Sequence, residues 1–97
     1  RVFIDVTADW CVTCKANKYN VLLRDDIQQA LSAPDVVALR GDWSRPSATI
    51  SQFLTTRGSA AVPFNQIYGP GLPQGEILPA LLDREQLLAT LSAAKGK

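Results

Sequence analysis

Residues 8–15, ADWCVTCK, contain both cysteines of this 97-residue chain, Cys11 and Cys14. Two cysteines separated by two residues occur in metal sites, in structural disulfides and in redox-active pairs. A disulfide between Cys11 and Cys14 closes so short a loop that it constrains the unfolded chain little, which makes a purely structural role a poor explanation. Histidine is absent from the chain, and this excludes a Cys/His catalytic pair and every zinc site that contains histidine.

The residues on both sides of this segment predict a strand that leads into a helix. Residues 2–7, VFIDVT, are rich in β-branched and aromatic side chains and are apolar on both faces apart from Asp5, as in a buried strand of a sheet covered on both sides. Residues 13–31 have a helical pattern, with a break into two helices expected at Asp25 and Asp26. Cys11 is therefore expected where the strand ends and the helix begins.

The remainder of the chain predicts two further helices and three further strands. We expect a second buried strand at residues 36–39, a helix that begins near Pro46 and ends at Gly58, strands at residues 66–68 and 76–78, and a helix that begins at Asp83 and frays from residue 93. A β-α-β unit joins parallel strands by a right-handed crossover, and the last two strands are close enough in sequence to form an antiparallel hairpin. The expected fold is α/β: a small mixed four-stranded sheet in the order β-α-β-α-β-β-α, with helices on both faces.

Composition and charge exclude several classes of function. Ten basic and nine acidic residues leave a net charge of +1, which gives no electrostatic reason to expect nucleic acid or anionic lipid as a partner. No apolar run approaches the roughly 18–20 residues that span a bilayer, so we expect no membrane insertion of this segment. The chain has no methionine and begins inside an apolar run, so we expect residues 1–97 to be one domain of a longer protein.

The predicted position of the cysteines favours thiol–disulfide exchange. Unpaired N–H groups and the positive end of the helix dipole stabilise a thiolate at the start of a helix, and thiolate is the reactive form of cysteine. Lys15 adds a positive charge nearby, and Trp10 adjoins Cys11, where it contacts partners or packs against the core. We expect Cys11 to be the nucleophile and Cys14, one turn further on and more shielded, to resolve the mixed disulfide. Such a pair is itself the redox centre and needs no bound cofactor or metal.

Two other interpretations of the cysteine pair stay open. Two thiolates are too few for a normal zinc site, but Cu(I) accepts soft ligands at low coordination number, so a copper-binding module is the strongest metal hypothesis. The pair can also be two ordinary buried cysteines in a domain that only binds a partner. Metal analysis, and the effect of alkylating both cysteines on partner binding, separate these hypotheses from exchange.

Asp5 and the Val62–Pro63 pair are the other candidate site residues. A carboxylate in the middle of the first strand is expected to face a covered side of the sheet, where burial raises its pKa and where it exchanges a proton with Cys14. The alternative for Asp5 is a strand edge, solvated or paired with a lysine. A cis bond before Pro63 would expose backbone groups beside Cys11 for an extended substrate, whereas a trans proline would only end a loop.

These features together resemble the thioredoxin superfamily across nearly the whole chain. The shared pattern is WCxxCK at a helix start, an aspartate six residues before the first cysteine and a later Val-Pro. The resemblance implies that Pro63 is cis and lies beside Cys11 and Cys14. The segments VTADWCVTCK, GDWSRP and VPFNQIYGPG are more closely similar to the C-terminal domain of the DsbD family of thiol:disulfide interchange proteins, in the long branch that includes the copper-sensitivity suppressor ScsB.

The DsbD resemblance implies a place in an electron relay. In that family a membrane-embedded domain draws electrons from cytoplasmic thioredoxin and passes them to the C-terminal domain in the periplasm. The C-terminal domain reduces an N-terminal domain of the same polypeptide, which then reduces periplasmic disulfide isomerases and related partners. The resemblance therefore implies a periplasmic protein-disulfide reductase domain of an inner-membrane protein, with thioredoxin-fold domains as partners and a link to copper tolerance through ScsB.

One position departs from the family pattern. The family carries a glutamate about four residues after the second cysteine, where it helps the counterpart of Asp5 to tune the cysteines. This chain has Ala16, Asn17 and Lys18 in that segment. The positive charge of Lys18 favours a thiolate, so we expect the pKa of Cys11 to lie below that of a typical DsbD C-terminal domain.

Overall fold

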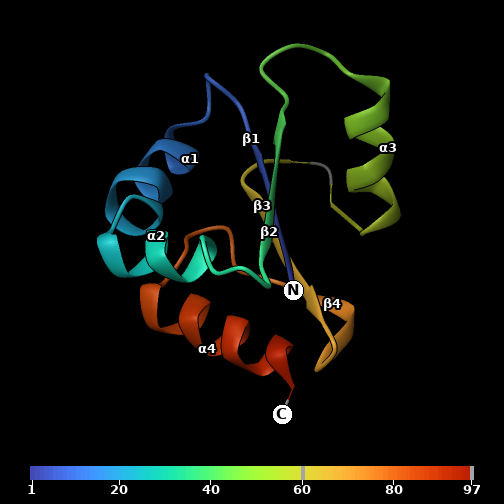
Figure 1. Ribbon diagram of the computed structural model, residues 1–97. Helices are drawn as coiled ribbons and strands as arrows, with labels where there is room; N and C mark the ends of the chain where they lie inside the picture. The colour runs from blue at the N-terminus through green and yellow to red at the C-terminus, as the bar shows by residue number, and fades with distance from the viewer. Residues whose placement is uncertain (60, 97) are drawn as a thin grey trace.

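The structure, a computed structural model, describes residues 1–59 and 61–96. Its elements, in chain order, are β1 (Val2–Thr7), α1 (Val12–Asn17), the short π-helix η1 (Lys18–Leu22), α2 (Asp25–Leu31), β2 (Val37–Asp42), α3 (Ala48–Thr56), β3 (Phe64–Gly69), β4 (Leu72–Ile77) and α4 (Arg84–Lys95) (Figure 1). The predicted order of strands and helices is confirmed. No helix within the two described ranges combines the length and the apolar character of a bilayer-spanning segment.

The four strands form one mixed sheet in the order β2-β1-β3-β4. β1 is parallel to β2 and antiparallel to β3, and β3 and β4 form an antiparallel hairpin. Helices α1, α2 and α4 lie on one face of this sheet and α3 lies on the other (Figure 1). The predicted α/β architecture with helices on both faces is confirmed, and β1, which leads into the cysteine segment, is an inner strand.

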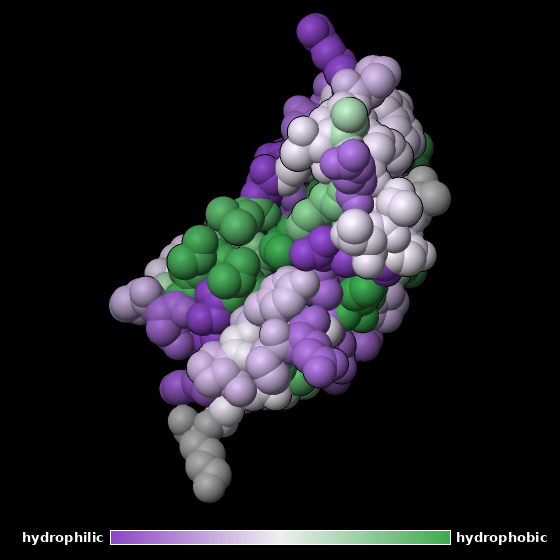
Figure 2. Space-filling model, turned by 90° about the vertical axis from the view of Figure 1, so that its right-hand side faces the viewer, coloured by the Kyte–Doolittle hydropathy of each residue, from purple (hydrophilic) through white to green (hydrophobic). Residues whose placement is uncertain are grey.

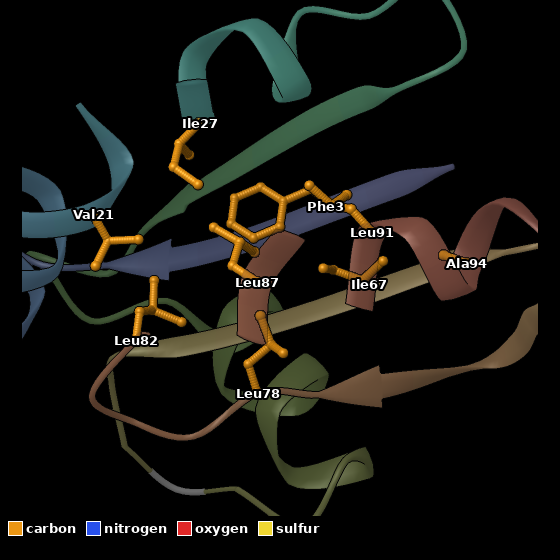
Figure 3. Close-up of a cluster of buried hydrophobic side chains, with 9 residues drawn as sticks. All are labelled: Phe3, Val21, Ile27, Ile67, Leu78, Leu82, Leu87, Leu91 and Ala94. Atoms are coloured by element: carbon orange, nitrogen blue, oxygen red, sulfur yellow. The ribbon is translucent and has the colours of Figure 1, made fainter. Parts of the chain in front are cut away.

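Alternation along β1 divides the hydrophobic core in two. The larger cluster joins β1 and β3 to α2 and α4 and consists of Phe3, Val21, Ile27, Ile67, Leu78, Leu82, Leu87, Leu91 and Ala94 (Figure 3). The smaller cluster lies on the α3 face and consists of Val6, Leu54 and Phe64. Because successive side chains of a strand point to opposite faces, Asp5 lies on the same face as Phe3, beneath α1 and α2.

β2 is more exposed than the buried strand predicted at residues 36–39. It lies at one edge of the sheet, and Val37 and Leu39 are 54% and 53% exposed. An apolar groove between this strand and α3 is lined by Ile4, Val6, Leu39, Ile50 and Phe53. Apolar side chains gather on the face seen from the α3 side (Figure 2). The prediction of a buried second strand is wrong, because an apolar run identifies a strand but not its position within the sheet.

Three predicted helix boundaries are also corrected. The break in the first helical region comes before Asp25, which begins α2 after Arg24. α3 begins after Ser47, whose hydroxyl accepts the backbone N–H of Ile50 at 3.3 Å, so its N-cap is this serine and Pro46 lies outside the helix. The last helix does not fray from residue 93, because Ala94 is fully buried in the larger core cluster.

Asn17 connects the end of α1 to the segment that precedes α4. Its side chain is buried; the amide N–H donates to the carbonyl of Ala80 at 2.8 Å, and the side-chain carbonyl accepts the N–H of Leu82 at 2.9 Å. Leu82 belongs to the larger core cluster. These two bonds therefore hold α1, the helix that carries Cys14, against the core.

Candidate active site

Cys11 and Cys14 lie at the start of α1 and are joined by a disulfide, with their Cα atoms 5.2 Å apart. Cys11 is the N-cap residue, and its sulfur accepts a hydrogen bond from the backbone N–H of Cys14 at 3.1 Å. Hydrogen bonds to charged acceptors are the stronger kind, so an N–H in this position favours a thiolate at Cys11. The cysteines thus lie at the junction of strand and helix that the sequence predicts.

The two cysteines are equally buried, at 6% exposure each. The greater shielding expected for Cys14 is therefore not found in the disulfide-bonded state. Ala8 and Val62 pack against the pair, and the Val62–Pro63 peptide bond is cis. The bend in front of β3 thus lies beside the cysteines, where the resemblance to the thioredoxin superfamily places it.

Asp5 lies near the centre of β1, below the helix that carries the cysteines. Its Oδ1 accepts a hydrogen bond from the side-chain amide of Asn65 at 2.9 Å, and Arg40 is its partner in the register with β2. Burial raises the pKa of Asp5 above its ordinary value of 3.8, and the Asn65 bond and the Arg40 charge oppose this only in part. Asp5 is therefore a carboxyl group with an elevated proton affinity.

The raised pKa of Asp5 predicts a pH-dependent gain of stability in the Asp5→Asn protein. A group that binds its proton more tightly in the folded state stabilises the fold below its unfolded pKa, and this contribution is lost as pH rises through the folded pKa. At pH 7 the buried carboxylate therefore lowers stability, and asparagine, which still accepts from Asn65, does not. We expect a higher urea midpoint for Asp5→Asn at pH 7 and a difference that closes below about pH 4. A lower midpoint at pH 7 would contradict this.

A cavity of about 330 Å³ connects Asp5 with the cysteine segment. Cys14, Lys15 and Lys18 line it together with Asp5. Lys15 and Lys18 are exposed, and the Lys18 ammonium lies 5.8 Å from the centre of the Tyr19 ring. Cys14 therefore shares this cavity with one buried carboxyl group, Asp5, and with two exposed lysines.

The loop between β2 and α3 supports the turn that precedes Cys11. The backbone N–H of Asp9 donates to the Ser44 hydroxyl at 2.8 Å, and that hydroxyl donates to Asp42 at 2.5 Å. The rings of Trp10 and Trp43 are tilted by 54° with centres 6.5 Å apart, and Trp10 is 61% exposed. Trp10 thus contacts another aromatic ring and still presents an apolar surface beside Cys11.

Two residues that the sequence alone did not single out belong to these surroundings. Asn65 bonds Asp5 from β3, and Ser44 bonds the cysteine segment from the β2–α3 loop. Asn65 follows Pro63 by two residues and stands beside a second amide, Gln66, in a strand whose other side chains are apolar or aromatic. A buried polar residue in such a strand is the signal that points to a bonded partner. Ser44 lies in the GDWSRP segment, and nothing in that segment's sequence predicts its hydrogen bond to Asp9.

The described part of the chain holds no group of three or more His, Cys, Asp or Glu side chains arranged to bind a metal ion. A Cu(I) site here would therefore consist of the Cys11 and Cys14 thiolates. Both sulfurs are free for such a role only after the disulfide is reduced.

A sequence profile of the family described as Thioredoxin-like matches residues 1–70. The DsbD c-terminal domain of Neisseria meningitidis is similar in its oxidised form (TM-score 0.77) and its reduced form (TM-score 0.74), each at 18% identity, covering 97% of this chain and 79% and 80% of theirs. A thioredoxin from Thermus thermophilus has a TM-score of 0.68 at 19% identity, covering 94% of this chain and 70% of that chain. A search of curated protein sequences finds no match.

The structural matches establish the fold, which is thioredoxin-like and has the arrangement of the DsbD C-terminal domain. The profile spans 70 of the 97 residues and includes Asp5, both cysteines and Pro63. A CxxC disulfide within this fold supports thiol–disulfide oxidoreductase activity. The chain belongs to the thioredoxin-like family.

Proposed function

We propose that this domain is a protein-disulfide reductase that passes two electrons by dithiol–disulfide exchange through Cys11 and Cys14. One observation carries the proposal: a disulfide at a helix start, with the Cys14 N–H on the Cys11 sulfur and the residue before a cis proline packed against the buried cluster that contains both cysteines. This arrangement combines a sulfur stabilised as a nucleophile, a second sulfur within bonding reach and an adjacent backbone bend.

Exchange with a partner disulfide takes two steps. The Cys11 thiolate attacks one sulfur of the partner, and the other partner sulfur leaves as a thiolate. The Cys14 thiol then gives its proton to Asp5, its sulfur attacks the Cys11 sulfur, and the bonded partner cysteine leaves as a second thiolate. Cys11 and Cys14 end as a disulfide, and the partner has gained two electrons.

The surroundings of Cys11 suit an extended segment of a protein substrate. The carbonyl of Val62 and the bend at Pro63 offer backbone contacts beside the cysteines, because Val62 packs against them. Trp10 offers an exposed apolar surface next to Cys11. Lys15 and Lys18 line the cavity beside Cys14, and positive charge near a cysteine pair favours the thiolate that starts the reaction.

We further propose that the domain works in the periplasm as part of a relay within a longer membrane protein. The similar Neisseria structures are of a DsbD c-terminal domain, and this likeness supports a membrane electron-transfer domain as donor. The acceptor would be a thioredoxin-fold or N-terminal domain that approaches Cys11.

The reduction potential of the Cys11–Cys14 couple tests the direction of electron flow. We expect equilibration in glutathione buffers to give about −200 to −270 mV, the range of thioredoxins and glutaredoxins. A value near about −120 mV would make the domain an oxidant and overturn the reductase proposal.

Metal analysis of the aerobically purified protein tests the copper alternative, since stoichiometric copper favours a Cu(I) module and a metal-free disulfide favours exchange.

A further inference from the structure

Asp5 lies between polar side chains from both neighbouring strands. In the sheet register its partners are Arg40 of β2 and Asn65 of β3. Asn65 is 1% exposed, and its amide N–H donates to Oδ1 of Asp5 at 2.9 Å. A buried amide lowers stability unless it is hydrogen-bonded, and here the bonded partner is the carboxyl group below the cysteines.

We propose that Asn65 is a positioning residue of the exchange reaction, an inference that rests on the proposed function. Its amide engages Oδ1 and fixes the orientation of the Asp5 carboxylate, so that Oδ2 remains to take the proton from the Cys14 thiol. Among the described residues, Asn65 is the one side chain that donates a hydrogen bond to Asp5. Asp5 and Cys14 line the same cavity, so proton transfer between them takes place within it.

The charges around the cavity do not replace this amide. The other titratable groups that line it are Asp9, Cys14, Lys15, Lys18, Tyr19 and Arg40. All of them except Cys14 are exposed, so solvent and salt screen their effect on Asp5. Of the two groups that lower the pKa of Asp5 against its burial, the Asn65 bond acts more strongly than the Arg40 charge. The Asn65 amide is thus the stronger of the two interactions that stabilise the ionised form of Asp5, which is the form that accepts a proton.

The Asn65→Leu protein tests the inference, because leucine keeps the side-chain size and removes the donor. We expect the titration of the Asp5 carboxyl carbon, followed by NMR, to move to higher pH than in the wild type. The pH profile for reduction of oxidised glutathione by the dithiol protein should move in the same direction. In an Asp5→Asn background the same replacement should leave that profile unchanged, because Asn65 acts through Asp5.

Gln66→Leu is the matched control. Gln66 is also a buried amide of β3, but its side-chain carbonyl accepts from Arg57 at 2.9 Å on the opposite face of the sheet. We expect this replacement to leave the Asp5 titration and the glutathione profile where they are. Circular dichroism of all variants shows whether each keeps the fold.

Three results would overturn the inference, and they are distinguishable from failure of the proposed function. An unchanged Asp5 titration in Asn65→Leu rejects the positioning role while a reactive wild type keeps the reductase proposal intact. A profile shift that persists in the Asp5→Asn background shows that Asn65 does not act through Asp5. A wild type that fails to reduce glutathione disulfide rejects the proposed function and the role of Asn65 in it, even where NMR still detects the Asn65–Asp5 contact.

Discussion

The Cys11→Ser protein is expected to lose reduction of partner disulfides altogether, whereas the Cys14→Ser protein is expected to stop halfway and accumulate a mixed disulfide. The Cys11 sulfur accepts the N–H of Cys14, so it is the sulfur prepared to act as a thiolate. A serine hydroxyl at that position does not become a nucleophile of this kind. Without Cys14 the first attack still takes place, but no second sulfur resolves the adduct.

Each serine variant is the control for the other, because both lose the disulfide and therefore the same covalent constraint. Reaction with oxidised glutathione, followed by intact mass under non-reducing conditions, should show a glutathione adduct on Cys14→Ser and none on Cys11→Ser. Dithiothreitol should remove the adduct. Full turnover by Cys11→Ser would reject the mechanism, and an adduct on Cys11→Ser alone would reverse the roles of the two cysteines.

The parts of the fold that depend on neighbouring residues were predictable from sequence. β1 covers the predicted residues 2–7, and Asp83 caps α4 by accepting the N–H of Gln86 at 3.1 Å, as its position before the helix predicts. The exposure of β2 was not predictable in this way. Val37 and Leu39 have strand character, but their burial depends on which strands lie next to β2, and that order is set by contacts far along the chain.

In the candidate site, too, the residues that stand in short sequence patterns were predictable and the contact that depends on strand pairing was not. The cysteine pair and Pro63 stand in short sequence patterns, and Asp5 stands out as the one charged residue of an apolar strand. Asn65 and Asp5 are 60 residues apart in the sequence, and their contact can be inferred only when the register of β1 with β3 is known. A shift of one residue in that register would turn Asn65 to the α3 face. Its contact with the carboxylate is therefore a property of the assembled sheet.

Replacement of Asn17 by leucine is expected to lower the free energy of unfolding by about 2–4 kcal/mol. Leucine has a similar volume but makes neither of the bonds to the carbonyl of Ala80 and the N–H of Leu82. Leu82 is buried, so its N–H loses a partner where water does not easily substitute. Urea unfolding of the oxidised protein measures the change with the disulfide present in both proteins.

Asn20→Leu is the matched control, since Asn20 is an exposed asparagine in η1, six residues after Cys14. We expect its free energy of unfolding to stay within about 0.5 kcal/mol of the wild type. Because Asn17 joins α1 to the core, the Asn17→Leu protein should also show faster hydrogen exchange at the Cys14 N–H, the group that bonds the Cys11 sulfur. A loss in Asn17→Leu no larger than in Asn20→Leu would mean that hydrophobic contacts such as those of Val21 hold this helical segment without the two bonds.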